Sequence, residues 1–180
     1  MEWAVLEQFP MDVTVRAAAS GDEQALARLI EVHHSPMVRA AYVVTGDPTT
    51  AQEAAQNAWS IAWRRLDTVR DPARIREWLV SISVNEARQL SRRSRRRRVR
   101  EIPVEGSDPV AGDPADDIAL VDLERALDGL SPDDRRLLAL RYVADLDSSD
   151  IADRLGLSAS GVRSRLSRTL ERLRRELDGV

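Results

Sequence analysis

The chain has 180 residues, of which 32% are charged and only 4% are aromatic. A core must therefore rest on Ala, Leu, Val and Ile, which suits small helical domains better than sandwiches or barrels rich in aromatic and β-branched residues. Cysteine is absent, which excludes disulfides and cysteine chemistry, and no apolar stretch approaches membrane-spanning length, so we expect a cytoplasmic protein without membrane insertion.

Charge is segregated along the chain, although the net charge is only −3. Residues 87–100 hold eight arginines and no acid, whereas residues 101–117 hold six acids and no base. Residues 163–175 then hold six arginines and one acid. Two basic blocks separated by an acidic strip predict that a polyanion is bound at two places.

Residues 13–100 predict one helical domain, preceded by an N-terminal extension of residues 1–12. In this domain an apolar i, i+3/i+4 stripe follows Asp22 and stops at Gly46, with an interruption or a second helix start at Pro36. We therefore expect a helical pair or one broken helix in this stretch.

Two more helices are expected in the same domain. Thr49 or Thr50 is the predicted cap of the first, whose inward face is mostly alanine. The second starts at Asp71-Pro72 and runs into the arginine block.

Residues 101–117 predict a flexible linker, because they contain three prolines, two glycines and six acids. About twenty residues at roughly 3.3 Å each span up to about 65 Å when stretched. The expected fold class is therefore all-α, with two small helical domains joined by a flexible linker and able to grip separate places on one target.

Residues 118–180 predict a compact unit that contains a helix-turn-helix. Ser131 precedes a proline and two acids, which is a strong start signal for a helix. Asp147 or Ser148 caps a short helix, and Gly156 serves the turn before a long last helix.

The last helix is amphipathic. Its inner stripe begins with Val162 and Leu166. Short hydroxyls and arginines on the opposite face suit entry into the major groove of DNA, whereas the alternative is an ordinary helical hairpin with a solvated basic face. The residues of that opposite face are Ser160, Arg163, Ser164, Ser167 and Arg168.

Three of the four tryptophans lie at helical spacing on apolar faces, which favours core packing over base stacking. They are Trp59, Trp63 and Trp78. His33 and His34 are adjacent on one helix and cannot face one metal ion together, so we expect surface or partly buried histidines. We find no paired catalytic carboxylates, phosphate-binding glycine loop or nucleophile with its base. We therefore expect neither enzyme activity nor a cofactor or metal.

Several motifs resemble the extracytoplasmic-function (ECF) sigma factors of bacterial RNA polymerase. Those similar to the last domain of the family are Leu140–Val143, Asp150–Ala152, Leu155–Ser158 and Val162–Leu166. Those similar to its first domain are Gly21-Asp22, Thr45–Asp47, Ala51–Gln56 with Trp59, and Trp78-Leu79 through Ile82 to Asn85. The resemblance covers about residues 13–177, and the two sets of motifs stand in the order of the family with a linker between them.

The resemblance implies that residues 13–100 form a sigma-2-like domain that binds core polymerase and the downstream promoter element. It places Glu53, Gln56 and Asn57 in the helix that docks on the clamp of the large polymerase subunit. Family members often have Asp where Glu53 stands and Glu where Asn57 stands. This difference predicts a weaker electrostatic attraction between this helix and the clamp. Without the resemblance, a solvated helix face is the favoured interpretation of these side chains.

The resemblance also implies two DNA contacts. Downstream-element recognition falls on the third helix and the preceding loop at residues 66–74, where Asn85 offers both a donor and an acceptor to a base edge. A capping or packing asparagine and a disordered basic run are the alternatives. The downstream candidates are Asn85, Arg88, Arg92 and Arg93. Residues 118–180 are the sigma-4-like domain, and its upstream-element candidates are Ser160, Arg163, Ser164, Arg165 and Arg168.

The function implied is that of a sigma factor, which binds core polymerase and directs promoter recognition, DNA melting and transcription initiation. The expected partners are core polymerase and promoter DNA, and an anti-sigma factor is a further candidate. Two alternatives stay open: a stand-alone helix-turn-helix regulator and a helical adaptor that binds only proteins. The first leaves the docking-type helix around Gln56 unexplained, and the second leaves the polar face of residues 160–168 unexplained.

Overall fold

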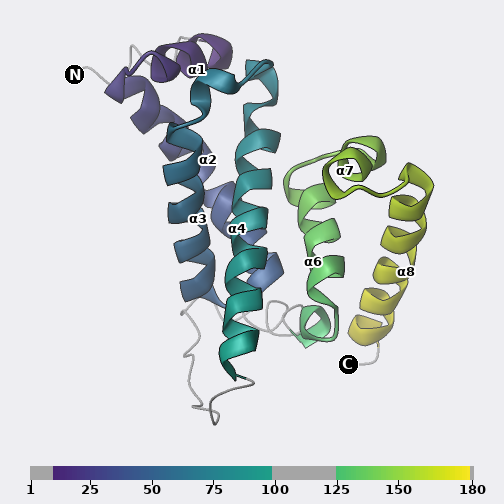
Figure 1. Ribbon diagram of the computed structural model, residues 1–180. Helices are drawn as coiled ribbons and strands as arrows, with labels where there is room; N and C mark the ends of the chain where they lie inside the picture. The colour runs from purple at the N-terminus through teal and green to yellow at the C-terminus, as the bar shows by residue number, and fades with distance from the viewer. Residues whose placement is uncertain (1–9, 99–124, 179–180) are drawn as a thin grey trace.

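The computed structural model describes residues 10–98 and 125–178, and within these ranges the chain is helical and has no strand. Four helices and two short 3₁₀ turns come from the first range (Figure 1). The second range holds the helical residues 125–128, three further helices and a π-helical turn. The first-range elements are α1 (Met11–Ala19), α2 (Glu23–Thr45), α3 (Pro48–Trp63), η2 (Leu66–Thr68), η3 (Pro72–Arg74) and α4 (Ile75–Arg98). The second-range elements are α6 (Pro132–Leu138), η4 (Ala139–Val143), α7 (Ser148–Leu155) and α8 (Ala159–Asp178).

Helix α2 begins and ends where the sequence predicts, but it is unbroken. The Asp22 carboxylate accepts hydrogen bonds from the backbone N–H groups of Gln24 and Ala25, and Gly46 ends the helix with φ 67°. The expected interruption at Pro36 is wrong, because α2 continues through it. Proline removes one helical hydrogen bond, and packing of α2 against α1, α3 and α4 outweighs that loss.

The predicted cap of α3 is also wrong. Asp47 is the N-cap, and its Oδ2 accepts a hydrogen bond of 2.7 Å from the backbone N–H of Thr50. Pro48 fits the first helical position, which puts the residue before it at the cap. The sequence pointed to a threonine because the proline was assigned to the preceding turn.

Helices α2, α3 and α4 form a bundle that is lined mostly by alanine. The inward side chains of α3 are fully or nearly fully buried alanines, and small side chains allow helices to approach closely. The hydroxyl of Ser83 on α4 donates to the Met37 carbonyl of α2 at 2.9 Å, and both residues are buried. The buried alanines of α3 are Ala51, Ala54, Ala55, Ala58 and Ala62.

The second range folds as its capping residues predict. Ser131 caps α6 and Asp147 caps α7, each accepting a hydrogen bond from a backbone N–H three residues later. Gly156 ends α7 with φ 66°, and the Ser158 hydroxyl accepts from the backbone N–H of Gly161 in the first turn of α8. Helices α7 and α8 pack against each other as the helix-turn-helix, and Ala152 of α7 is buried. The π-helical turn η4 was not predicted.

The two ranges pack against each other. Helix α6 and the turn η4 contact α2 and α4, and one buried apolar cluster includes residues from both ranges. Figure 1 shows α6 between the N-terminal bundle and α8. The separated arrangement that a stretched linker allows is therefore not the one adopted here. The linker itself, residues 101–117, lies outside the described residues, and the predicted domain boundaries stay predictions.

Candidate functional site

The predicted docking residues lie on the outer face of α3, opposite its alanine stripe. Glu53 and Gln56 are exposed, and Asn57 is half-buried at the edge of the same face. Their i, i+3 and i+4 spacing brings the three side chains together on one side of the helix. The face presents a carboxylate and two amides, which suit hydrogen bonds with arginines of a partner.

Two of the predicted downstream-element residues are engaged by α6. The Asn85 Oδ1 accepts a hydrogen bond from the Arg136 guanidinium. The Arg88 Nε donates to the Asp133 carboxylate at 3.0 Å. Arg92 and Arg93, one turn further along α4, are exposed. Base-contacting and phosphate-contacting candidates thus already have protein partners from the other half of the chain.

Arg136 sits in this junction at an electrostatic cost. Burial lowers the pKa of its guanidinium, the positive charge of Arg88 lowers it further, and the Asp133 carboxylate opposes both. Its buried Nε has no hydrogen-bond partner among the described residues. A buried N–H group without an acceptor costs free energy, so this part of the junction favours separation of the two halves.

Three further contacts join the halves nearer the start of α4. Arg74 of η3 forms an ion pair with Asp150 of α7, which raises the pKa of the Arg74 guanidinium chiefly through the hydrogen bond between them. Arg76 donates to the Val143 carbonyl at 3.2 Å. Arg154 of α7 donates to the Ser81 hydroxyl at 3.1 Å. The first helix of the helix-turn-helix is therefore held against the N-terminal bundle.

The outward face of α8 carries most of the predicted upstream-element residues. Ser160, Arg163, Ser164 and Arg168 are all exposed. The Arg168 Nε donates to the Ser164 carbonyl one turn earlier at 3.3 Å, which lays its side chain along the helix. These positions agree with a helix face available to a DNA groove.

Arg165 lies on a different side of α8, toward α6. Its Nε donates to the Asp134 carboxylate at 2.6 Å, and the Ser131 hydroxyl donates to the other oxygen of that carboxylate. Burial opposes ionisation of Asp134, but the hydrogen bonds from Ser131 and Arg165 and the charges of Arg165 and Arg172 together hold its pKa below the usual 3.8. Arg165 thereby ties the last helix to the start of α6.

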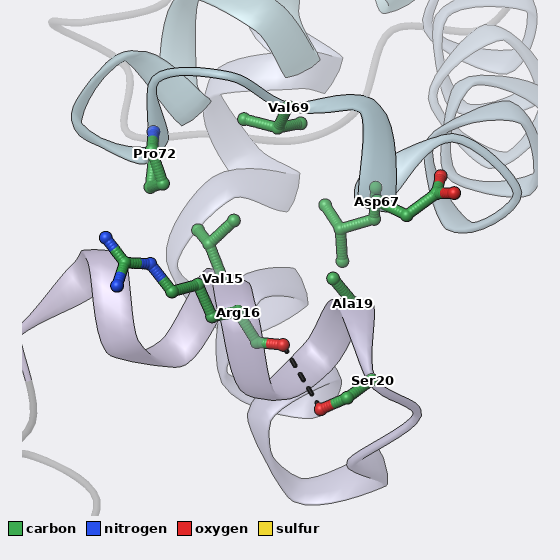
Figure 2. A pocket seen from close by; sticks show the side chains of 8 residues that line it. Val15, Arg16, Ala19, Ser20, Asp67, Val69 and Pro72 are labelled. Carbon is green, nitrogen blue, oxygen red and sulfur yellow. Dashed lines mark hydrogen bonds between the residues drawn. The ribbon is translucent and has the colours of Figure 1, made fainter.

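A hollow of about 300 Å³ lies between α1 and the loop to which downstream recognition was assigned. Figure 2 shows Val15 of α1 facing Val69 of the loop, with the Arg16 guanidinium and the Asp67 carboxylate turned outward. The Ser20 hydroxyl donates to the Arg16 carbonyl and so stays bound to its own helix. Apolar and polar residues line the hollow together, and its polar groups do not converge on one point as those of a catalytic site do.

The aromatic and histidine predictions hold only in part. Trp59 and Trp78 are half-buried against the core, whereas Trp63 is 44% exposed, so its predicted core packing is wrong. Trp63 ends α3 on the side away from the alanine stripe. His33 is buried rather than at the surface, and His34 accepts a hydrogen bond of 3.2 Å from the Trp59 indole.

No three His, Asp or Glu side chains of residues 10–98 and 125–178 are grouped as a metal site would need. None of the helices described is both long and apolar enough to cross a bilayer.

Comparison with known families assigns both halves. A family model for Sigma-70 region 2 matches residues 29–97, and one for Sigma-70 region 4 matches residues 120–173. The first match covers most of the bundle, including α3, and the second covers the helix-turn-helix, in the order that the sequence motifs predict. The chain belongs to the sigma-70 family of RNA polymerase sigma factors.

Individual relatives extend over nearly the whole of this sigma factor. It is 33% identical over 168 residues to a probable RNA polymerase sigma factor, RfaY of Xanthomonas campestris pv. campestris, covering 89% of this chain but only 42% of that one. It is 28% identical to the RNA polymerase sigma-E factor of Streptomyces coelicolor, covering 87% and 88% of the two chains. Other relatives are ECF sigma factors by name.

A solved structure of similar fold is that of CnrH in complex with the cytosolic domain of CnrY. It aligns with a TM-score of 0.68 and 25% identity, covering 94% of this chain and 97% of that one.

Sequence reasoning missed the residues that join the two halves of this sigma factor. They are Arg74, Arg76, Ser81, Asp133, Arg136, Asp150 and Arg154. Their partners are 45 to 76 residues apart. Periodicity describes neighbours within one helix, so no local signal marks these pairs.

Proposed function

We propose that this chain works as an ECF-type sigma factor that brings core RNA polymerase to promoters, working in the cytoplasm and without catalytic chemistry of its own. The strongest support is that two features occur in one chain. A region-2 bundle has an exposed polar helix face, and a region-4 helix-turn-helix follows it with an exposed face of hydroxyls and arginines. Both faces are accessible in one molecule, as recruitment of polymerase to DNA requires.

Docking on polymerase falls to the outer face of α3. Glu53 and Gln56 are exposed while both halves of the chain are in place, so core polymerase is able to reach them before any rearrangement. The negative charge of Glu53 suits an arginine or lysine of the clamp, and the Gln56 and Asn57 amides add orientation-dependent hydrogen bonds.

Upstream-element recognition falls to α8. Arg163 and Ser164 point outward from the Val162 and Leu166 stripe, as base-contacting residues of a recognition helix do. Arg165 acts differently, through its ion pair with Asp134, which fixes the rotation of α8 relative to α6. Arg165 is thus a positioning residue, and its loss acts on DNA binding through the orientation of the helix.

Downstream-element recognition by Asn85 and Arg88 requires that they leave Arg136 and Asp133. The promoter strand and α6 compete for the same polar atoms, since Asn85 Oδ1 and Arg88 Nε are already hydrogen-bonded in this closed arrangement. The free chain therefore binds promoter DNA weakly, and core polymerase, by separating the halves, makes the downstream residues available.

An inhibitory protein that holds the two halves together is a further partner we propose for this chain. The similar fold of CnrH, solved with the cytosolic domain of CnrY, supports the proposal. Such a partner acts in the same direction as the closed arrangement and adds to its stability by mass action.

One gel-shift experiment tests the function. Promoter DNA is mixed with the chain alone, with core polymerase alone and with both, at physiological salt. A sequence-specific complex that forms only in the third mixture supports the sigma-factor function. Tight specific binding by the chain alone contradicts it and favours a stand-alone regulator. Binding of core with no effect on DNA favours a protein-only adaptor.

A further inference from the structure

The C-terminal end of α3 carries an exposed tryptophan in line with the docking residues. Trp63 is 44% exposed, although the chain has only seven aromatic residues: four Trp, two Tyr and one Phe. The exposure holds with both halves of the chain packed together, so neither half covers the indole. Single exposed apolar side chains are common on protein surfaces, and Tyr142 and Leu157 are exposed here too. What distinguishes Trp63 is its place on the same helix face as Glu53 and Gln56.

Trp63 lies on the same line along the helix as Gln56. Seven residues make almost two helical turns, so the two side chains differ by about 20° in direction and by about 10 Å along the axis. Ser60, which lies between them, is also exposed. The indole therefore continues the polar surface of Glu53 and Gln56 toward the end of the helix.

The other aromatic residue of α3 shows the contrast. Trp59 is half-buried, and its indole N–H donates to His34 of α2, so it serves the bundle. Trp63 faces away from the buried alanines at Ala58 and Ala62. Local packing accounts for Trp59 but leaves the exposure of Trp63 unexplained.

Charge gives the surface a direction. Glu53 lies near the start of the exposed line, and the exposed Arg64 caps its end at nearly the same angle around the helix, eleven residues later. The surface thus runs from a carboxylate through uncharged polar groups and an indole to a guanidinium. A helical partner surface with a basic group near one end, an apolar recess and an acidic group near the other complements it.

We propose that Trp63 is the aromatic anchor of the polymerase-docking surface and that it inserts into an apolar recess of the clamp beside the site for Glu53 and Gln56. This inference rests on the proposed function and adds to it the residue that contributes most to docking. Tryptophan is the residue type most enriched among binding hot spots, surrounded by polar contacts that exclude water. On this surface Glu53, Gln56 and Arg64 form the polar surround.

The test measures the affinity of the full chain for core polymerase in the absence of DNA. Trp63→Ala is expected to weaken Kd on the order of 30-fold, as truncation of a hot-spot residue does. Trp63→Phe, which keeps a ring, is expected to lose much less. Tyr142→Ala is the matched control, because Tyr142 is 59% exposed but lies on η4, and it should bind core as the unaltered chain does.

A second measurement keeps the test independent of folding. Hydrogen exchange of the unaltered chain, with and without core polymerase, should show protection that extends from Glu53 to the end of α3. Core affinity that is unchanged in Trp63→Ala, or exchange at the end of α3 that is unaffected by core, overturns the proposal. Unchanged core affinity combined with defective promoter opening assigns Trp63 to base stacking instead. If the unaltered chain does not bind core at all, the proposed function fails rather than this inference alone.

Discussion

Helices α3 and α4 belong to the same bundle, but one outer face is exposed to solvent and the other is in contact with the second half of the chain. The outer face of α3, with Glu53 and Gln56, is open to solvent. The face of α4 with Asn85 and Arg88 is engaged by α6. Under the proposed function, this difference predicts an order of events: core polymerase binds α3 on the closed chain, and promoter DNA binds α4 only after α6 has moved.

The contrast also explains why closure is compatible with regulation. The polar contacts that join the halves are ion pairs and hydrogen bonds, and the ion pairs at partly exposed positions each contribute little. They add to the buried apolar cluster that includes residues of both halves. Arg136 adds a buried donor without a partner. Under the proposed function, this closed state is stable enough to reduce DNA binding and is opened when core polymerase binds.

The largest expected effect comes from damage to the open face. A Glu53→Arg, Gln56→Ala double variant should abolish co-purification with core polymerase, because it replaces the carboxylate by a like charge and removes an amide. Helix content should be unchanged, since both side chains are exposed. Upstream-element contacts by the separate α8 face should survive. Normal assembly with core and normal initiation by this variant would show that the docking assignment is wrong.

The next largest effect is expected on the face of α8. Arg163→Ala should weaken binding of the polymerase holoenzyme to the upstream element by about 1–3 kcal/mol if the side chain contacts a base. Titrations on the promoter and on a variant with an altered upstream element distinguish the cases. Equal loss on both sequences assigns Arg163 to phosphate, and no loss removes it from the interface.

Arg165 provides the comparison for that experiment. Arg165→Ala should lower the thermal stability of the chain, because it breaks the pair with the mostly buried Asp134. Its effect on DNA binding should be matched by Asp134→Asn, which leaves every α8 side chain in place. A DNA-binding defect in Arg165→Ala without one in Asp134→Asn would assign Arg165 a direct DNA contact.

Neutralising the contacts on the closed face should have a smaller effect. An Asp133→Asn, Asp150→Asn variant loses the ion pairs with Arg88 and Arg74, each worth about 0.2–1 kcal/mol at exposed positions. The free variant should therefore open more often, seen as a larger average distance between labels on α3 and α8 in energy-transfer measurements. Asp145→Asn is the matched control, because Asp145 pairs with Arg141 inside the same half. An unchanged distance distribution would show that these pairs do not hold the halves together.

The smallest effect concerns pH and the buried histidine of the bundle. Burial and the nearby charge of Arg76 lower the pKa of His33 below 6.5, and neither ring nitrogen has a hydrogen-bond partner among the described residues. The unfolded chain therefore binds a proton more readily than the folded chain does, so stability should fall as pH is lowered through 6.5.

Urea unfolding between pH 7.5 and 5.5 measures this slope. His33→Leu, which cannot be protonated, should flatten it. A slope in His33→Leu equal to that of the unaltered chain would place the titrating group elsewhere.

Much of the fold follows from local sequence signals. Asp22, Gly46, Ser131, Asp147 and Gly156 mark helix ends in the structure as they do in the sequence. Capping depends on a side chain and backbone groups two to four residues away, so a reader of the sequence has all the participants in view. The order of the two helical units and the polar face of α8 are predictable for the same reason.

The errors arise where a residue's surroundings come from elsewhere in the chain. Pro36 does not break α2, because three neighbouring helices support it. Trp59 and Trp63 both lie at helical spacing in the sequence. Trp59 donates a hydrogen bond to His34 of α2, whereas Trp63 is exposed. The exposure of a side chain depends on which helix lies opposite it. Helical periodicity predicts the direction in which the side chain points but not which part of the protein it meets.

The sequence by itself determined that the chain is helical, that it has a bundle followed by a helix-turn-helix, and which side chains share a helix face. The tertiary structure alone decided that the halves close on each other, that Asn85 and Arg88 are engaged by Arg136 and Asp133, and that the α3 face stays open. The physical reason is the separation along the chain of the residues that interact. Helix formation and capping act over a few residues, whereas each cross-half contact joins residues many helical turns apart, and its weak energy is decided by the packing of the whole chain.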